Sequence, residues 1–378
     1  MKNYDIIGNM NNDKNKRIVF LDYLRLIACF MVMIIHAVEP YYFNQNGDLY
    51  IANKCDAFWV AVVDSAARSC VPLFVMASSF LLFPLRMTAG NFFRRRAVRI
   101  LIPFAIWLGV YVWHFGIKPL DVVFNFPMAA GHLWFVPMLL GLYIAMPLLS
   151  PWAEKASKRE VSLFIGLWFF TSLFPFIRRL SLITLGEPSF GAVPFLWGEC
   201  PWNGFGAFYY VSGFFGYMLI AFYIRKFVPA LSWAKTLAFS IPLFVVGMAI
   251  MAGGFYFLIP GGDTYPVHEP YGAAVRLEMT LEYCSLGVAA ATVSLFLVIR
   301  KFTAEGWFYN RIIRPASEAS YGTYLMHMIV LAPLAGYFKG TFSTPVSVVV
   351  VAVGSFVVST IISCLLRKIP VIGKFIAG

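Results

Sequence analysis

Three ionisable residues, Asp22, Arg25 and His36, interrupt an apolar run that is long enough to cross a lipid bilayer. Arg25 follows Asp22 by three residues, and His36 follows Arg25 by eleven, which is just over three whole turns of an α-helix. We therefore expect the three side chains on one face, with Arg25 and His36 about 16 Å apart along the axis. An imidazole placed in this way can act as a general base or as a nucleophile. The structural alternative is an Asp22–Arg25 ion pair and a histidine that bonds a backbone carbonyl.

Other charged residues also fall within apolar stretches, where an ionisable side chain is costly unless it is paired or hydrated. Asp64 and Arg68 have the spacing of an ion pair within one helix, although Arg68 could instead line a polar cavity. Glu278 and Glu282 are one helical turn apart and should face the protein interior, where Arg68 or Arg276 could pair with them. Arg68 and the two glutamates are thus candidates for lining a substrate cavity.

Two more histidines are candidates for the same cavity. His327 lies in the apolar segment SYGTYLMHMIV, where a single buried histidine is more often a hydrogen-bonded packing residue than a catalyst. His132 comes two residues before Trp134 at the start of another apolar segment, and we expect it at the membrane interface.

A cluster of arginines lies in the segment NFFRRRAVRILIPF, at the start of a further apolar run. The usual explanation is that such a cluster anchors the cytoplasmic side of a membrane protein. Arg96 and Arg99, however, are three residues apart, on one side of a helix end. That spacing suits a bidentate grip on the phosphates of a cytoplasmic cofactor.

The elements that must position these residues are transmembrane helices. Of the 378 residues, 60% are hydrophobic and 13% are charged, whereas soluble domains carry roughly 25% charged residues. Soluble enzyme folds are excluded because a chain of this size could not hide so much apolar surface without lipid. Transmembrane β-barrels are excluded because the apolar runs are about twenty residues long and do not alternate with period two. We predict an all-α polytopic membrane protein, a bundle of about ten transmembrane helices. The predicted helices cover 18–38, 57–84, 98–117, 132–150, 160–177, 207–224, 236–258, 275–299, 318–338 and 345–366.

The positions of Lys and Arg predict the topology. With the N-terminus inside, 22 of the 30 lie in inner segments and six in outer ones, while Arg25 and Arg68 lie within helices. Both termini are therefore predicted to be cytoplasmic, in a multi-pass protein of the inner or plasma membrane. The organisation is a tail over 1–17, a single membrane domain over 18–366 and a second tail over 367–378. Because topology accounts for the net charge of +12, we expect no nucleic-acid partner.

Motifs for other chemistry are missing from the sequence. There is no P-loop, no GxGxxG fingerprint, no GxSxG elbow and no HExxH, and the six cysteines form no CxxC pair. We therefore expect neither a metal site nor a permanently bound cofactor.

Five segments resemble, in the same order, those of the acyltransferase family 3 membrane proteins: LDYLRLIACFMVMIIH, VPLFVMASSFLL, RRAVRILIPF, HLWFVPMLLGLYIAMPLL and SYGTYLMH. That family transfers acyl groups, mostly acetyl, to sugars of bacterial envelope polymers. Its motifs are a first-helix Arg followed by ten residues and a His, and an Arg-x-x-Arg pair at the inner end of the third helix. The resemblance implies that Arg25 and His36, with Asp22 on the same face, are catalytic, and that Arg96 and Arg99 bind acyl-CoA.

The resemblance implies an O-acyltransferase that moves an acyl group, most often acetyl, from cytoplasmic acetyl-CoA to a hydroxyl of an envelope glycan or lipid-linked saccharide. His36 would act as a general base or form a transient acyl-histidine, and the sequence leaves both open. The alternative class is a transporter or flippase for a glycolipid, whose buried charges would form a gating or proton-relay network. An assembly subunit without chemistry would not need three polar residues on one face. Neither the acceptor nor the oligomeric state follows from the sequence.

Overall fold

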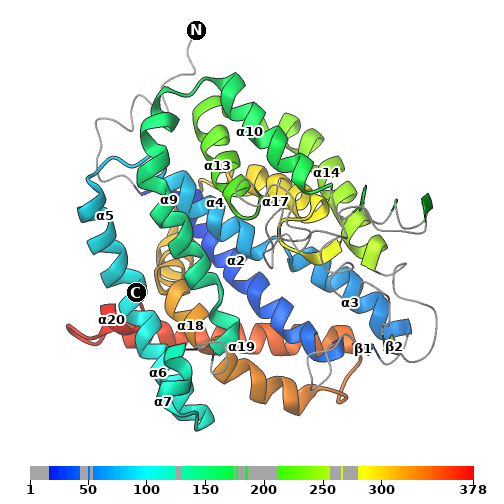
Figure 1. Cartoon of the computed structure of the whole chain (residues 1–378). Helices are drawn as coiled ribbons and strands as arrows, with labels where there is room; N and C mark the ends of the chain where they lie inside the picture. The colour runs from blue at the N-terminus through cyan, green and yellow to red at the C-terminus, as the bar shows by residue number, and fades with distance from the viewer. Residues whose placement is uncertain are drawn as a thin grey trace.

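The computed structural model describes residues 17–42, 50–51, 54–124, 130–173, 176–177, 180, 184–185, 212–255, 265–266 and 280–378. Helices make up almost all of this part of the chain (Figure 1). The sheet found in it consists of two short antiparallel strands, β1 (Tyr50–Ile51) and β2 (Tyr265–Pro266).

The longer helices are α2 (Val19–Val38), α3 (Lys54–Ala67), α4 (Cys70–Leu82), α5 (Ala89–Arg96), α6 (Ile102–Phe115), α9 (Phe135–Lys155), α10 (Lys158–Thr171), α13 (Phe215–Phe227), α14 (Trp233–Met248), α17 (Leu286–Ile299), α18 (Arg314–Phe338) and α19 (Thr344–Arg367). Two further helices, α7 (Pro119–Phe124) and α20 (Gly373–Ile376), are short. Short 3₁₀ turns cover Glu39–Tyr41 and Gly131–Leu133. Turns of π-helix cover Ala97–Leu101, Ala249–Gly253 and Tyr309–Ile313.

Six helical stretches of the described chain are long and apolar enough to cross a bilayer, and α17 is a shorter apolar helix. The six stretches are Val19–Tyr41, Cys55–Leu82, Ala89–Phe115, Gly131–Lys155, Trp233–Gly253 and Thr344–Arg367. The predicted class, a helical multi-pass membrane protein, is confirmed at this level. The number of ten spans and the cytoplasmic position of both termini stay predictions.

Breaks in three of the predicted helices have local causes. The predicted helix over 57–84 is divided into α3 and α4, because the ring of Pro72 clashes with the carbonyl four residues earlier and removes one helical hydrogen bond. The predicted helix over 207–224 is interrupted at 212–214, where Gly213 has a φ of 73°, and 207–211 lie outside the described residues. The predicted helix over 275–299 is interrupted at 282–285, because α17 begins only after the N-cap residue Ser285, and 275–279 lie outside the described residues.

Helix α2 lies at the centre of the bundle and packs against α3, α4, α17, α18 and α19 (Figure 1). Its Leu24 and Ala28 have no exposed surface. Helices α14 and α17 approach closely at Gly247 and Gly287, where a Cβ on Gly247 would lie 2.8 Å from the Gly287 carbonyl oxygen. Small residues allow such backbone contact between membrane helices. The central position of α2 brings its polar residues against several neighbouring helices.

Candidate active site

His36 and Glu39 form an imidazole–carboxylate pair at the end of α2. The α-helix ends at Val38 because Pro40 has no N–H to continue the helical hydrogen bonds, and Glu39 starts the 3₁₀ turn that follows. His36 Nδ1 lies 2.7 Å from Oε2 of Glu39. A carboxylate can only accept, so Nδ1 carries the hydrogen and Nε2 of the neutral ring keeps its lone pair. Sequence reasoning missed Glu39, although its spacing of three residues from His36 could have indicated the pair.

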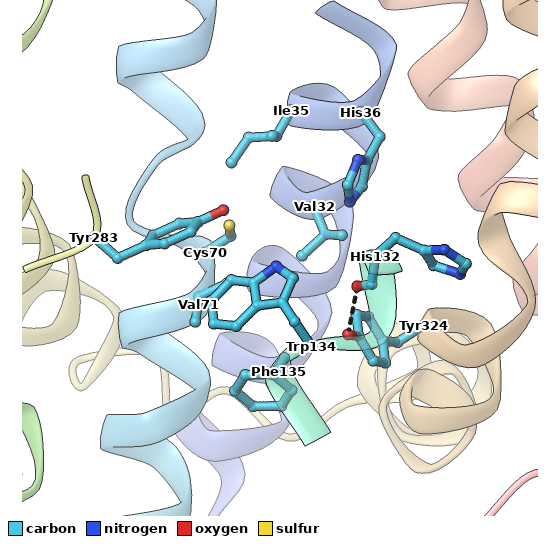
Figure 2. A pocket seen from close by; sticks show the side chains of 10 residues that line it. All are labelled: Val32, Ile35, His36, Cys70, Val71, His132, Trp134, Phe135, Tyr283 and Tyr324. Carbon is cyan, nitrogen blue, oxygen red and sulfur yellow. Dashed lines mark hydrogen bonds between the residues drawn. The ribbon is translucent and has the colours of Figure 1, made fainter. Parts of the chain in front are cut away.

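A narrow pocket lies beside His36 (Figure 2), and its space amounts to about 270 Å³ when the open solvent at its mouth is included. Its lining residues come from α2, α4, the start of α9 and the turn before it, the turn before α17, and α18, namely Val32, Ile35, His36, Cys70, Val71, His132, Trp134, Phe135, Tyr283 and Tyr324. The Tyr324 hydroxyl donates a 3.0 Å hydrogen bond to the His132 carbonyl, which holds the turn before α9 against α18. The imidazole of His36 thus borders a mostly aromatic and aliphatic cavity in which few polar groups could compete for a ligand.

The three histidines His36, His132 and His327 meet at this end of the bundle. The ring centroids of His36 and His327 are 4.9 Å apart, and those of His327 and His132 are 5.3 Å apart. His327 is fully buried, as expected, but it is not isolated from other histidines. His132 was expected at the membrane interface, whereas its ring packs inside against Tyr111 and its Nε2 is buried. Tertiary packing therefore collects histidines that lie far apart in the sequence.

Asp22 sits at the opposite end of α2, where its carboxylate is almost saturated with hydrogen bonds. Arg17 donates to both carboxylate oxygens, and the hydroxyls of Tyr309 and Ser317 donate over 2.6 and 2.9 Å. The expected pair with Arg25 is present, but at 3.6 Å it is the longest of these contacts. Asp22 thus fastens α2 to α18 and to the turn before α18.

The main partner of Asp22 is therefore Arg17, which the sequence reasoning had placed in the N-terminal tail. Arg17 also contacts Glu318 of α18, and Glu318 in turn lies 3.7 Å from Arg367 of α19. Burial alone would lower the pKa of Arg17, but the hydrogen bond and charge of Asp22 and the charge of Glu318 raise it above its usual value. Arg17 stays a cation and links three helices.

Arg25 has unused hydrogen-bonding capacity. Its ion pair with Asp22 is the one polar contact that its guanidinium makes within the described part of the chain. Its electrostatic neighbours include Tyr143 of α9 and Arg96 at the end of α5. The guanidinium is 31% exposed, so it can reach a ligand from its end of α2.

Arg96 and Arg99 differ in their surroundings. Arg96 stacks on the rings of Phe92 and Tyr143, and its buried Nε has no hydrogen-bond partner among the described residues. Arg99 is exposed. Helix α5 changes into a π-helical turn at Ala97, so Arg96 and Arg99 no longer share one face as they would in a regular α-helix. Arg96, rather than the pair as a unit, is thus directed toward the neighbourhood of Arg25.

The predicted Asp64–Arg68 ion pair is confirmed, and Arg68 does more than pair. It donates to both oxygens of Asp64 and, over 2.9 Å, to the hydroxyl of Tyr42. Its guanidinium lies 5.4 Å from the ring centroid of Tyr283, a pocket residue, and its charge acts on Glu39. Arg68 therefore supports the pocket wall and the carboxylate that holds His36.

Of the two glutamates predicted near Arg68, Glu282 is among the described residues. Glu282 lies in a bend before α17 instead of within a helix, and Arg68 is its electrostatic partner. Glu278 and Arg276 lie outside the described residues. No three His, Cys, Asp or Glu side chains in the described ranges are arranged as a metal-ion site.

The long apolar helices define a helical membrane protein, and a paired histidine borders a pocket within its bundle. The chain matches the family model of an acyltransferase domain over residues 18–366, and it belongs to acyltransferase family 3. It is a membrane acyltransferase. Comparison with curated proteins and with solved structures gave no match.

Proposed function

We propose that this protein is an O-acyltransferase that moves an acyl group, in the first place acetyl, from cytoplasmic acyl-CoA to a hydroxyl of an envelope glycan or lipid-linked saccharide. The observation that carries the proposal is the His36–Glu39 pair at the pocket, because its geometry leaves Nε2 of His36 as a base. Family membership supplies the acyl transfer in general. The same membership favours this function over a glycolipid transporter.

In the proposed reaction, the acceptor oxygen attacks the thioester carbonyl carbon while Nε2 of His36 takes the hydroxyl proton. A carbon–oxygen bond forms, the carbon–sulfur bond breaks, and the CoA thiolate receives the proton that His36 holds. Glu39 keeps the imidazole oriented and stabilises its protonated form across the 2.7 Å contact. An acyl-histidine intermediate would use the same nitrogen, and a trapped acyl-protein after rapid quenching would distinguish it from direct transfer.

The acyl-CoA is proposed to enter from the Arg25 end of α2. Arg25 and the unpartnered Nε of Arg96 supply donors for phosphate, and charge-assisted contacts of this kind are the strong ones. Arg99 is exposed and would act on the approaching CoA from outside. The pantetheine arm would then span the roughly 16 Å to His36 along the axis of α2. In this proposal, the CoA phosphates would bind at one end of α2, and the acceptor would meet the acyl group at the other end.

Aromatic side chains support a saccharide as acceptor. The rings of Trp134 and Tyr283 are neighbours in the pocket wall, with their centroids 5.5 Å apart, and Phe135 also lines the pocket. Aromatic faces offer a large apolar surface on which the apolar face of a sugar ring can stack. The hydroxyl that reacts would then be the one that reaches His36.

The experiment is transfer of label from radioactive acetyl-CoA into the glycan and lipid fractions of membranes that contain the protein. His36→Ala should lower the transfer by roughly 10²–10⁴-fold, the usual contribution of a general base. The matched control is His114→Ala, which changes an exposed histidine of α6. A His36→Ala protein that transfers acetyl at the rate of the His114→Ala control would refute the role of His36.

A further inference from the structure

His327 is a second imidazole with a fixed tautomer next to His36. Its Nδ1 is hydrogen-bonded to the backbone carbonyl of Tyr324, three residues earlier in α18. A carbonyl oxygen can only accept, so the hydrogen is on Nδ1 of His327. Nε2 of the neutral ring is therefore an acceptor. It is buried and has no hydrogen-bond partner within the described part of the chain.

The two rings are close but not bonded in this state. Their centroids are 4.9 Å apart and their planes are inclined by 37°. His36 gives its Nδ1 hydrogen to Glu39, so its own Nε2 is also an acceptor. Two lone pairs cannot form a hydrogen bond. His36 and His327 can therefore bond through Nε2 only after His36 has taken up a proton.

A buried acceptor without a donor is costly, and His132 does not supply the donor. The ring of His132 meets that of His327 nearly edge-on, at 81°, and its own Nε2 is likewise buried without a partner. Among the described residues, the neighbouring ring of His36 would supply a donor once catalysis has protonated it. Leaving Nε2 of His327 free in the resting state thus favours the state in which His36 is protonated.

We propose that His327 is a positioning residue whose Nε2 accepts a hydrogen bond from Nε2–H of protonated His36 during acyl transfer. This inference rests on the proposed function of His36 as the base. The acceptor O–H bond breaks and an N–H bond forms on His36, and the hydrogen stays on His36, shared with His327. It then passes to the leaving CoA thiolate. Glu39 and His327 hold the two nitrogens of the imidazolium from opposite sides.

Two substitutions separate this role from a structural one. His327→Gln keeps an acceptor near the Nε2 position, whereas His327→Asn keeps a donor near Nδ1 for the Tyr324 carbonyl and loses the Nε2 acceptor. We expect His327→Asn to lower kcat about 10–100-fold and His327→Gln to stay within about 10-fold of wild type. KM for acetyl-CoA should be unchanged in both variants. If His327 only bonds Tyr324, the order of the two variants is reversed, and that result would overturn the proposal.

A second measurement does not depend on activity. Nitrogen-15 NMR of the detergent-solubilised full chain, labelled at histidine, reports which ring nitrogens carry hydrogen, with His114→Asn as a matched control for assignment. We expect Nε2 of His327 to carry no hydrogen and its resonance to shift when His36 becomes protonated. In the His36→Asn variant, this shift should not occur. A protonated Nε2 on His327, or a resonance that ignores His36, would overturn the proposal. Absence of acetyl transfer by the wild type, with the NMR result as expected, would instead refute the proposed function.

Discussion

Glu39 Oε2 and His36 Nδ1 lie 2.7 Å apart, with Glu39 one helical turn beyond the histidine and just outside α2. Pro40 has no N–H to continue the α-helix, so Glu39 begins a 3₁₀ turn while its own backbone stays helical, and its side chain reaches the ring three residues earlier. The carboxylate thereby fixes the tautomer in which Nε2 of His36 is basic.

Glu39→Gln should lower acyl transfer by about 10–100-fold, as expected when the partner that orients a functional histidine is replaced. The amide can still accept the Nδ1 hydrogen, but it carries no charge to stabilise protonated His36. The measurement is kcat in the acetyl-CoA assay, with Glu305→Gln as control, since Glu305 is exposed. Equal rates for the two variants would show that Glu39 is not part of the site.

Asp22 and Arg25 should respond differently to substitution. Arg25→Ala should remain as stable as the wild type, because Asp22 keeps its hydrogen bonds from Arg17, Tyr309 and Ser317. Asp22→Ala should cost about 3 kcal/mol, near the lower end for a broken buried pair, since Arg17 is 35% exposed. Thermal unfolding in one detergent compares the variants. Equal loss of stability in both would contradict the view that Arg17 is the main partner.

Loss of Arg96 should weaken CoA binding more than loss of Arg99. Arg96→Ala should raise the Kd by about 10–100-fold, because a charge-assisted hydrogen bond contributes about 1.5–3 kcal/mol. Arg99→Ala should have a smaller effect, since Arg99 is exposed beyond the π-helical turn. Arg95→Ala, at another exposed arginine of α5, is the control. Calorimetry with CoA measures all three, and a Kd for Arg96→Ala equal to that of the control would remove Arg96 from the donor site.

Cysteine labelling tests the predicted topology. Ser343→Cys, in the turn before α19, should react with an impermeant maleimide added outside the cell. Glu305→Cys, in the segment between α17 and α18, should react only after permeabilisation. The background needs Cys55→Ser and Cys200→Ser, because Cys55 is exposed and Cys200 lies in the loop predicted to be external. If Glu305→Cys reacted from outside the cell and Ser343→Cys did not, the topology would be the reverse of the predicted one.

Local rules predicted several features of the bundle, and they failed where the chain departs from regular helix. The Asp64–Arg68 pair followed from a spacing of four residues in one helix, and the Asp22–Arg25 contact followed from a spacing of three. The break before α17 did not follow, because Leu281, Tyr283 and Cys284 satisfy the hydropathy of a membrane helix without requiring its geometry. Glu282 consequently lies in a bend.

The sequence by itself determined the membrane class, the long apolar α2 and the single face shared by Asp22, Arg25 and His36, because hydropathy and the helical period act over neighbouring residues. Only the tertiary structure decided their partners. Tyr309 and Ser317 reach Asp22 from almost 300 positions away, and His327 reaches His36 in the same manner. Contacts between helices depend on how side chains pack in three dimensions, and no spacing along the chain encodes them.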